Sequence, residues 1–372
     1  MAFGCKVLGC LVRFFQWIPV VFINSVIVWS YYAYVFILCF ESVKSNVEKA
    51  MYLIFYHPFF LMLMVSYWRT ILTDLKSPPS QFSLSEADKE KIENGENAKE
   101  ILERFSSKLP TCTRTMSGGV RYCDICNQIK PDRCHHCSMC RKCVLKMDHH
   151  CPWVNNCVCY FNYKFFILFL FYAILYTLYV TATVTKYFLA FWNNTLEGDG
   201  KLHILFLFFV AIMFCISLWS LFGYHVYLTT VNKTTLESFR VPYFINGPDK
   251  KGFNLGSAIK NVEQVFGTNR LLWFLPIKTS LGDGVRFPLN HRPESDRLLS
   301  DRERWMEEGE LDTPNEQASD SEKMDESIET IGVRTPELSE INEMQATVSV
   351  SQNVRPDILE VSMKPQNEGT TL

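Results

Sequence analysis

Four long apolar runs constrain the fold of this chain more than any other feature. The runs cover about residues 18–40, 51–68, 165–192 and 202–230. A helix needs about 20 apolar residues to cross a hydrocarbon core about 30 Å thick, and each run meets or approaches this length. We therefore expect an α-helical polytopic membrane protein with four transmembrane helices.

The second run is the weakest of the four, because it is the shortest and because His57-Pro58 interrupts it. A buried soluble helix is the alternative. Pairing with the first run across the polar residues 41–49 favours a transmembrane hairpin. The first run is too long and continuous for the apolar region of a signal peptide, and no small-residue cleavage site follows it.

Basic residues predict the orientation of the spans. The segment between the second and third runs is rich in Lys and Arg, from Arg69 to Lys146, whereas the two short loops on the other side hold only Lys44, Lys49 and Lys201. Basic loops stay on the cytosolic side of a membrane. We expect both termini and the segment between the second and third runs to face the cytosol.

The average composition hides parts of unlike character. Aromatic residues make up 14% of the chain, yet the residues after about Asp283 contain almost none. Residues 290–372 are rich in Glu, Ser, Asp, Thr and Asn, which predicts disorder. The net charge of −2 gives no support for a nucleic-acid partner, and we expect none.

These changes divide the chain into regions. We expect a cytosolic N-terminus (1–17), a transmembrane hairpin (18–68), a cytosolic linker (69–120), a cysteine-rich domain (121–164), the third and fourth spans (165–230), a cytosolic region that folds against the membrane face (231–288) and a disordered tail (289–372). Within the linker, residues 80–109 are polar with apolar side chains at helical spacing, which predicts a solvated helix.

Cysteine placement points to metal binding. Eight of the fourteen cysteines lie between Cys123 and Cys157, in CxxC-like spacings that alternate with histidines. This density suits metal thiolates in a reducing compartment better than disulfides in an oxidising one. A structural zinc ion takes four Cys or His ligands in tetrahedral geometry. The candidates exceed the eight ligands that two zinc ions require, and spacing alone does not say which of them are left for other work.

Longer motifs in residues 121–166 resemble the DHHC family of protein S-acyltransferases. The matching stretches are KPDR at 130–133, DHHC at 148–151, CPWVNNC at 151–157 and NYKFF at 162–166. After the fourth run, TTLE at 234–237 is similar to the family's TTxE motif, and Asn261 lies in a segment like its C-terminal PaCCT motif. The stretch WSYYAY at 29–34 resembles the vertebrate branch of the DHHC-2, -15 and -20 type enzymes. The resemblance covers about residues 17–288.

The resemblance implies two structural zinc ions with interleaved ligands. One ion would be held by Cys123, Cys126, His136 and Cys143, and the other by Cys137, Cys140, His150 and Cys157. This assignment leaves Asp148, His149 and Cys151 free for chemistry. Because His150 and Cys157 would hold one metal, the chain that carries Cys151 between them would be rigid.

The same resemblance implies a two-step transfer of palmitoyl or similar long acyl chains from acyl-CoA to cysteines of membrane-associated proteins. Cys151 as a thiolate would attack the thioester of acyl-CoA and become transiently acylated. His149 would accept the thiol proton, and Asp148 would orient the imidazole ring. A cysteine of the protein substrate would then take the acyl chain.

The apolar acyl chain is expected to occupy a cavity among the four helices. Trp153 would pack near its thioester end. Ser30 and Tyr176 are polar groups inside apolar spans and could face each other at the closed end, although an ordinary interhelical hydrogen bond is the favoured alternative. The charged CoA moiety would stay at the cytosolic face among basic groups. These candidates are Arg121, Lys130, Arg133, Arg141 and Lys146. For any one of them, a solvated surface charge is the favoured interpretation.

Two residues depart from the family pattern. Cys159 stands where the family usually has Gly, and Phe161 where it has a small or polar residue. A cysteine loses the access to positive φ that glycine provides. We therefore expect these residues to disturb the local packing or lower the activity, and Cys159 could compete as an acyl acceptor.

Two other function classes stay open at this point. A zinc-organised membrane adaptor without catalysis would need the same metal ligands, and so would a membrane-bound zinc-finger ubiquitin ligase. Neither explains the intact set Asp148, His149 and Cys151. The enzyme is the favoured interpretation.

Short motifs near the chain ends predict location. Glu294 precedes the pair Leu298-Leu299 by four residues, which is the acidic dileucine pattern that clathrin adaptors read. A chance match or a helical turn on the membrane face is an equal alternative. We expect cycling between Golgi, plasma membrane and endosomes. Cys5 and Cys10 precede the first span and are candidate acylation sites, which would make the chain a lipoprotein.

Overall fold

The computed structural model describes residues 14–94, 97–198 and 200–290, which all belong to one compact unit. The expectations for Cys5, Cys10, Leu298 and Leu299 lie outside the described residues, as does the tail from residue 291.

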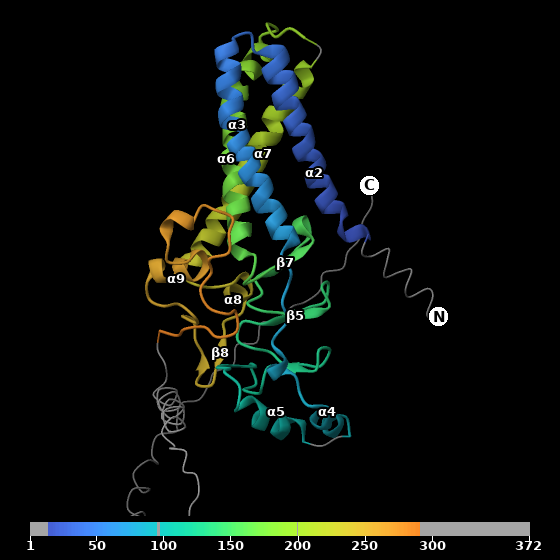
Figure 1. The fold of residues 1–372 in the computed structure, drawn as a ribbon, viewed down its shortest axis with the longest axis vertical. Helices are drawn as coiled ribbons and strands as arrows, with labels where there is room; N and C mark the ends of the chain where they lie inside the picture. The colour runs from blue at the N-terminus through green and yellow to red at the C-terminus, as the bar shows by residue number, and fades with distance from the viewer. Residues whose placement is uncertain (1–13, 95–96, 199, 291–372) are drawn as a thin grey trace, which may run out of the picture. The chain divides into compact units, whose positions relative to one another are not determined.

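Four helical stretches of the described residues are long and apolar enough to cross a membrane, which confirms the expected spans. They are α2 (Ile18–Tyr31) with its π-helical continuation η1 (Tyr32–Ser42), α3 (Asn46–Leu72), α6 (Tyr163–Trp192) and α7 (Lys201–Thr230). They run side by side in Figure 1. The helices extend beyond the apolar runs because polar residues also form their ends. At the start of α3, for example, the Ser45 hydroxyl accepts a hydrogen bond from the Glu48 N–H.

α6 is the central helix of the bundle. Within its most apolar stretch 61% of the residues are buried, against 17% for α7. Aromatic side chains fill much of the space between the helices, and the rings of Tyr34 and Tyr56 stack with their centroids 4.3 Å apart. Pro58 lies inside α3 without ending it. The exposed apolar side chains of the outer helices, such as Val28 and Ile216, are then the surface that contacts lipid.

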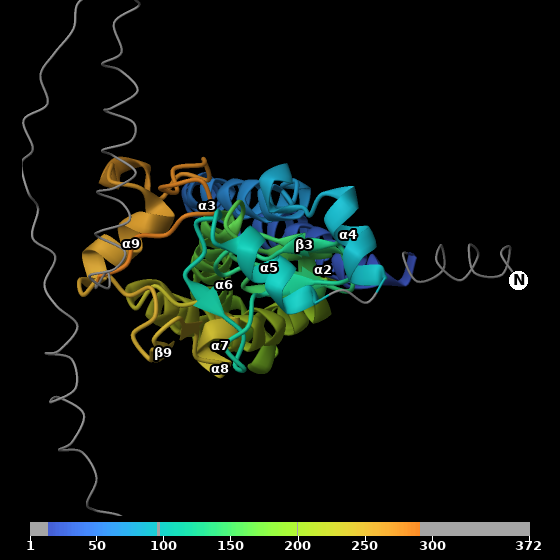
Figure 2. The same ribbon diagram turned by 90° about the horizontal axis from the view of Figure 1, so that it is seen from below.

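Between α3 and α6 the chain forms small hairpins at one end of the bundle. β2 (Tyr122–Cys123) pairs with β3 (Gln128–Ile129), β4 (His135–Cys137) with β5 (Lys142–Val144), and β6 (His149–Cys151) with β7 (Asn156–Val158). Each turn contains one residue with positive φ: Asn127, Arg141 and Asn155. Figure 2 views the ribbon from below and shows these strands covering the helix ends.

The linker does not form one helix over residues 80–109, so the expected helix was wrong in its extent. The structure has a 3-10 turn, η2 (Ser80–Phe82), and two short helices, α4 (Glu86–Glu93) and α5 (Ala98–Ser106). Ser85 and Asn97 accept N-cap hydrogen bonds, and each of them begins a new helix. Phe82 is fully buried and packs in a cluster with Cys123 and Ile129.

The segment after α7 returns to the hairpins. It contains α8 (Thr235–Phe239), β8 (Tyr243–Phe244), β9 (Gly247–Pro248), α9 (Ala258–Phe266) and the 3-10 turn η4 (Arg270–Leu272). β8 pairs with both β9 and β1 (Thr113–Arg114), so the segment joins the linker in one three-stranded sheet. Asn261 in α9 donates to the Thr230 carbonyl at the end of α7, at 2.8 Å.

Two asparagines fix the hairpins to the end of α3. The side-chain amide of Asn156 donates to the carbonyls of Thr70, Ile71 and Thr73 at 3.2, 3.0 and 3.0 Å. Asn162 donates to the Thr70 carbonyl at 3.1 Å. The last carbonyls of a helix have no partner within the helix, so these bonds satisfy groups that are buried here. The position of β7 is thereby tied to a transmembrane helix.

The departures Cys159 and Phe161 are accommodated. Cys159 is not among the described residues with positive φ, so the expected need for glycine was wrong. Its side chain is fully buried, and its N–H donates to Asn162 at 2.8 Å. The ammonium groups of Lys76 and Lys278 lie 5.4 and 5.1 Å from the centroid of the Phe161 ring. Whether these residues change the activity stays a prediction.

We expect Cys159→Gly to destabilise the protein by about 1–2 kcal/mol, because it empties a buried site and frees a backbone that needs no positive φ. The measurement is the apparent melting temperature of the purified protein in detergent. Cys159→Ala is the matched control, since it shortens the side chain and keeps the backbone restricted, and it should lose less. A melting temperature for the glycine variant above that of the parent would contradict this account.

Candidate active site and metal centres

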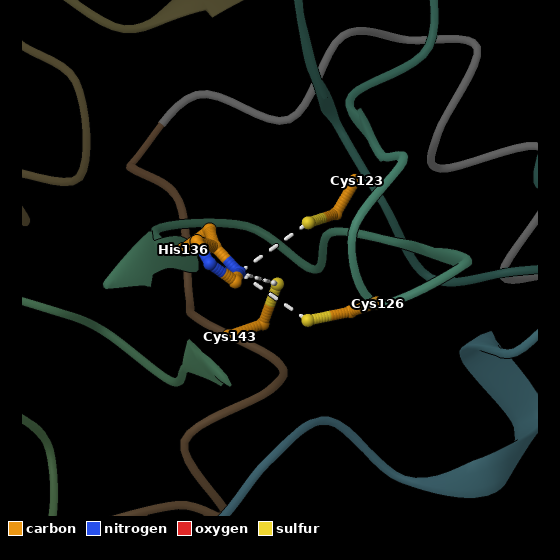
Figure 3. Close-up of side chains that lie close together, drawn as sticks. All are labelled: Cys123, Cys126, His136 and Cys143. Atoms are coloured by element: carbon orange, nitrogen blue, oxygen red, sulfur yellow. Dashed lines mark hydrogen bonds between the residues drawn. The ribbon is translucent and has the colours of Figure 1, made fainter. Parts of the chain in front are cut away.

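The first cysteine-histidine group joins two hairpins. Figure 3 shows Cys123, Cys126 and Cys143 with their sulfur atoms turned toward the His136 ring. The Sγ atoms of these cysteines lie 3.5, 3.3 and 3.9 Å from His136 Nδ1. β2 supplies Cys123, β4 supplies His136 and β5 supplies Cys143. These are the four residues that the resemblance assigns to one zinc ion.

The second group joins the two hairpins nearer to the helices. The Sγ atoms of Cys137, Cys140 and Cys157 lie 3.7, 3.4 and 3.6 Å from His150 Nδ1. In each group the four donor atoms all lie within 4.8 Å of one another. Three thiolates and one imidazole are the ligand type and number of a structural zinc site. Both groups could therefore hold a zinc ion with protein ligands alone.

Cys151 lies where the hairpins meet the bundle. It ends β6, and the 3-10 turn η3 (Pro152–Val154) follows it. Its side chain is only 6% exposed and packs in an apolar cluster with Tyr67 and Phe166. The Tyr67 hydroxyl donates to the Trp153 carbonyl at 2.9 Å. A residue of α3 therefore fixes the turn that follows this cysteine.

His149 and Asp148 form a close pair beside Cys151. His149 Nδ1 lies 2.7 Å from Asp148 Oδ2. Burial opposes the charged imidazole, but the hydrogen bonds to Asp148 and Cys151 outweigh it and raise the pKa of His149 to about 9. Burial also opposes ionisation of Asp148, yet the hydrogen bond with His149 keeps the pKa of this carboxyl below its usual range. The pair therefore favours an imidazolium next to a carboxylate.

Thr235 of the TTLE motif holds the other side of Asp148. Its N–H donates to Asp148 Oδ1 at 2.9 Å, and its hydroxyl donates to Oδ2 at 2.7 Å. Asp148 is 1% exposed, so these bonds replace the water that a buried carboxylate loses. The motif was recognised in the sequence, but its contact with Asp148 could not be foreseen.

Arg133 and Glu237 form a buried ion pair next to this contact. Arg133 donates through Nε and Nη2 to the two carboxylate oxygens of Glu237, at 2.8 and 2.7 Å. It also donates to Asn232. Burial opposes the charge of Glu237, but Arg133 keeps the pKa of this carboxyl below its usual range. The pair connects the KPDR motif to the TTLE motif.

The basic groups expected near CoA differ in their surroundings. Arg121 is half-buried and donates to Thr113 and to two backbone carbonyls, and Arg133 is paired as described. Lys146 is buried, and burial together with Arg133 lowers its pKa to about 7. Arg141 is exposed, and Lys130 is half-buried like Arg121. Solvated surface charge, which was the favoured interpretation for each group, is thus wrong for Arg133 and Lys146.

His225 of α7 lies close to the Asp148–His149 pair and is not among the site residues predicted from the sequence. Its ring lies 5.8 Å from the His149 ring, and one of its nitrogens belongs to a group with Asp148 and His149 whose donor atoms lie within 4.8 Å of one another. The Tyr163 hydroxyl lies 3.1 Å from His225 Nδ1. No local signal could have identified His225, because its proximity comes from the packing of α7 against α6.

An apolar cavity of about 250 Å³ runs among the transmembrane helices from Cys151 and Trp153. Ser30 and Tyr176 also line it, and their hydroxyls lie 2.9 Å apart. The Tyr56 hydroxyl of α3 also lies 2.9 Å from the Tyr176 hydroxyl. The expected residues at the two ends of an acyl site therefore line one cavity.

Known proteins are similar to this chain over most of its length. The sequence model for the DHHC palmitoyltransferase family matches residues 117–241. Palmitoyltransferase ZDHHC15 of Xenopus laevis is 51% identical over 318 residues, which are 83% of this chain and 94% of the relative. Palmitoyltransferase ZDHHC20-A of Danio rerio is 56% identical over 75% of this chain and 79% of its own length. Human palmitoyltransferase ZDHHC2 is 54% identical over 76% and 78%.

The matched residues include both cysteine-histidine groups, Cys151 with its neighbours, and the TTLE motif. The relatives belong to the branch that residues 29–34 indicated. The chain is therefore a member of the DHHC palmitoyltransferase family.

Proposed function

We propose that this protein S-acyltransferase moves palmitoyl or similar long acyl chains from acyl-CoA to cysteines of membrane-associated proteins, through an acyl-Cys151 intermediate. The observation that carries the proposal is the position of Cys151. It lies beside the Asp148–His149 pair and also lines the apolar cavity between the spans. The Cys151 thiol therefore lies both next to the groups that would activate it and at the site that would hold an acyl chain.

Before the first step the proton of the Cys151 thiol has moved to His149, which Asp148 favours as an imidazolium, so Cys151 faces the imidazolium as a thiolate. The thiolate attacks the acyl-CoA carbonyl, a new carbon–sulfur bond forms and the bond to the CoA sulfur breaks. The CoA thiolate takes the proton as it leaves. In the second step the thiolate of a substrate cysteine displaces Cys151 in the same way. A thioester replaces a thioester, so no external energy source is needed.

Asp148 would act through His149. Its carboxylate holds His149 Nδ1 at 2.7 Å, which leaves Nε2 for the thiol. Thr235 holds the same carboxylate from the opposite side, so the imidazole has one preferred orientation. The TTLE motif is in this account a positioning element.

Two structural zinc ions would be held by the two groups described above, and when bound they would crosslink the hairpins without an open coordination position. His150 and Cys157 of the second group flank Cys151 in the chain. They also form a cross-strand pair of β6 and β7, so the ligands fix the strand that ends at the nucleophile.

The cavity would hold the acyl chain. Each methylene that leaves water contributes about 0.8 kcal/mol, so an apolar cavity retains a long chain strongly. Trp153 would contact the thioester end, and the Ser30–Tyr176 pair would stop the chain at the far end. A structural interhelical hydrogen bond is the alternative for this pair. The charged CoA moiety would remain on the cytosolic side with Lys130 and Arg141, which keep solvent-facing surface.

A zinc-organised adaptor without catalysis remains the alternative class. It would have no use for a buried carboxylate, an imidazole and a thiol that share one end of an apolar cavity. A ubiquitin ligase would present its metal-bound hairpins to a soluble partner, whereas β6 and β7 are fixed to α3 by Asn156. These contacts support the enzyme over both alternatives.

Orientation and location complete the proposal. The charge distribution supports a cytosolic position for both termini and for the hairpins. The dileucine at Leu298-Leu299 supports, from sequence alone, recognition by clathrin adaptors and cycling between Golgi, plasma membrane and endosomes.

Replacement of the nucleophile tests the mechanism. We expect Cys151→Ser to abolish autoacylation and lower transfer more than about a thousandfold, because a hydroxyl at this position is a far weaker nucleophile. Incubation with labelled palmitoyl-CoA, followed by hydroxylamine treatment, measures the acyl-enzyme. Zinc content should stay near that of the parent. Appreciable transfer by this variant would remove Cys151 from its role.

Ligands and catalysts are separated by a second set of variants. We expect Cys137→Ala to lower the zinc content and the yield of folded protein, because an incomplete tetrahedral site loses folding energy. His149→Ala should keep the metal and lower the rate by about 10²–10⁴-fold. Elemental analysis and acyl transfer are measured on the same samples. Cys134→Ala is the control for a buried cysteine outside both groups, and equal zinc loss in all three would refute the ligand assignment.

The proposed recognition of the dileucine by clathrin adaptors is tested at the cell surface. We expect Leu298→Ala combined with Leu299→Ala to raise the amount of protein at the plasma membrane, because endocytosis by clathrin adaptors would fail. Surface biotinylation measures this amount against total protein. Cys151→Ser serves as the control that loses activity with an intact dileucine. Unchanged surface levels in the double variant would reduce the motif to a chance match.

A further inference from the structure

We propose that residues 271–277, hereafter the apolar loop, insert into the bilayer beside α6 and bind the C-terminal segment to lipid. The loop reads LLWFLPI and is bounded by Arg270 and Lys278. It follows α9 and appears in orange beside the lower part of the bundle in Figure 1. The proposed partner is the acyl-chain region of the membrane, and it does not depend on the catalytic activity.

The apolar loop exposes large side chains that no described residue covers. Leu271 is 86% exposed, Phe274 58% and Leu275 43%. A contiguous group of this kind on a water-facing surface costs free energy and marks an interaction site. Seven consecutive apolar residues therefore need a partner.

Two hydrogen bonds place the apolar loop at the depth of a transmembrane helix. The Tyr172 hydroxyl donates to the Phe274 carbonyl at 2.7 Å, and the Lys164 ammonium donates to the Leu272 carbonyl at 2.7 Å. Both donors belong to α6, so the loop lies against its first turns. Lys164 is 2% exposed and also donates to Thr279.

The length of α6 allows the depth of these contacts in the bilayer to be estimated. Its 30 residues span about 45 Å, which exceeds the hydrocarbon core by about 15 Å. When the excess is divided equally between the two ends, the hydrocarbon core begins about five residues into α6. Tyr172 lies beyond this point, nine residues after Tyr163. Because helical side chains point toward the helix N-terminus, the Tyr172 hydroxyl and the carbonyl of Phe274 lie near the boundary between the headgroups and the hydrocarbon core.

The backbone of the apolar loop is suited to an environment without water. Polar backbone groups in a bilayer must find partners within the protein. The N–H groups of Leu272, Trp273, Leu275 and Ile277 donate to carbonyls two or three residues earlier. Pro276 has no N–H, and the indole N–H of Trp273 donates to the Gly267 carbonyl at 2.8 Å. A loop exposed to water would not need this degree of internal pairing.

The charges at the two ends match the interface. Arg270 and Lys278 would lie at the level of the lipid phosphates, where long basic side chains keep their heads in a polar layer. The Arg270 guanidinium also lies 6.0 Å from the Trp273 ring centroid. Apolar residues between two basic ends are the pattern of an interfacial anchor.

Insertion would also fix the height of the active site. Thr279 and Ser280, which follow the loop, donate to the Phe266 and Val265 carbonyls of α9 at 2.6 and 2.9 Å. Val265 packs in the same apolar cluster as Cys151. The apolar loop is thus connected to Cys151 through α9.

The test places a fluorescent noncanonical amino acid at position 271 of the full-length protein in phosphatidylcholine vesicles. A second preparation carries the probe at position 125, because Ile125 is 76% exposed in the turn between β2 and β3, away from the spans. Each preparation is quenched with acyl-brominated phosphatidylcholine and, separately, with iodide from the aqueous phase. Zinc content verifies that both variants fold.

We expect several-fold stronger quenching by the brominated chains at position 271 than at position 125, and the reverse order with iodide. Equal quenching of both positions by iodide would place the loop in water and overturn the proposal. Protection of position 271 from both quenchers would also overturn it, because a protein surface, from a second copy or another chain, would then cover the loop.

Discussion

The buried carboxylate of Asp148 is the contact on which the rest of the site depends. It accepts hydrogen bonds from the Thr235 N–H and hydroxyl, and it holds His149 Nδ1. An unpaired carboxylate in this position would be prohibitively unstable, because burial removes its hydration. Its charge is retained only because two segments, which are far apart in the sequence, bring donors to it. The orientation of the imidazole, on which the proposed reactivity of Cys151 depends, follows from this arrangement.

The ion pair of Arg133 and Glu237 stabilises the same junction from the other side. Removing one partner of a buried pair costs about 3–5 kcal/mol, because the other charge is left without compensation. Glu237 also completes a capping box with Thr234 at the start of α8. The carboxylate that caps this helix is therefore the same one that binds Arg133. The TTLE motif thus joins helix capping, an ion pair and the orientation of the catalytic imidazole in four consecutive residues.

The sequence specified the features that depend on local pattern. The spans follow from hydrophobic length. The two cysteine-histidine groups follow from the family motif, which assigns each of the eight ligands to a position in this sequence. Contacts that depend on tertiary packing could not be predicted from the sequence. His225 reaches His149 because α7 packs against α6, and Phe82 is buried because it packs against residues of the hairpins. Cys159 shows the limit of family comparison, because glycine in relatives does not mean that the backbone requires positive φ.

The proposed chemistry requires Cys151 at one height relative to the bilayer, because the acyl chain is apolar while CoA and the protein substrate are polar. Asn156 and Asn162 meet this requirement from one side, since they bind the last carbonyls of α3 and so set the distance from its end to β7. On the other side, α9 packs near Cys151 and Asn261 binds it to the end of α7. The hairpins and α9 are therefore fixed to the ends of two parallel spans, α3 and α7, and a tilt of the module about either attachment would strain the other. In the proposed mechanism, a rigid position at the interface would let the Cys151 thiol reach both a chain in the membrane and a cysteine in the cytosol.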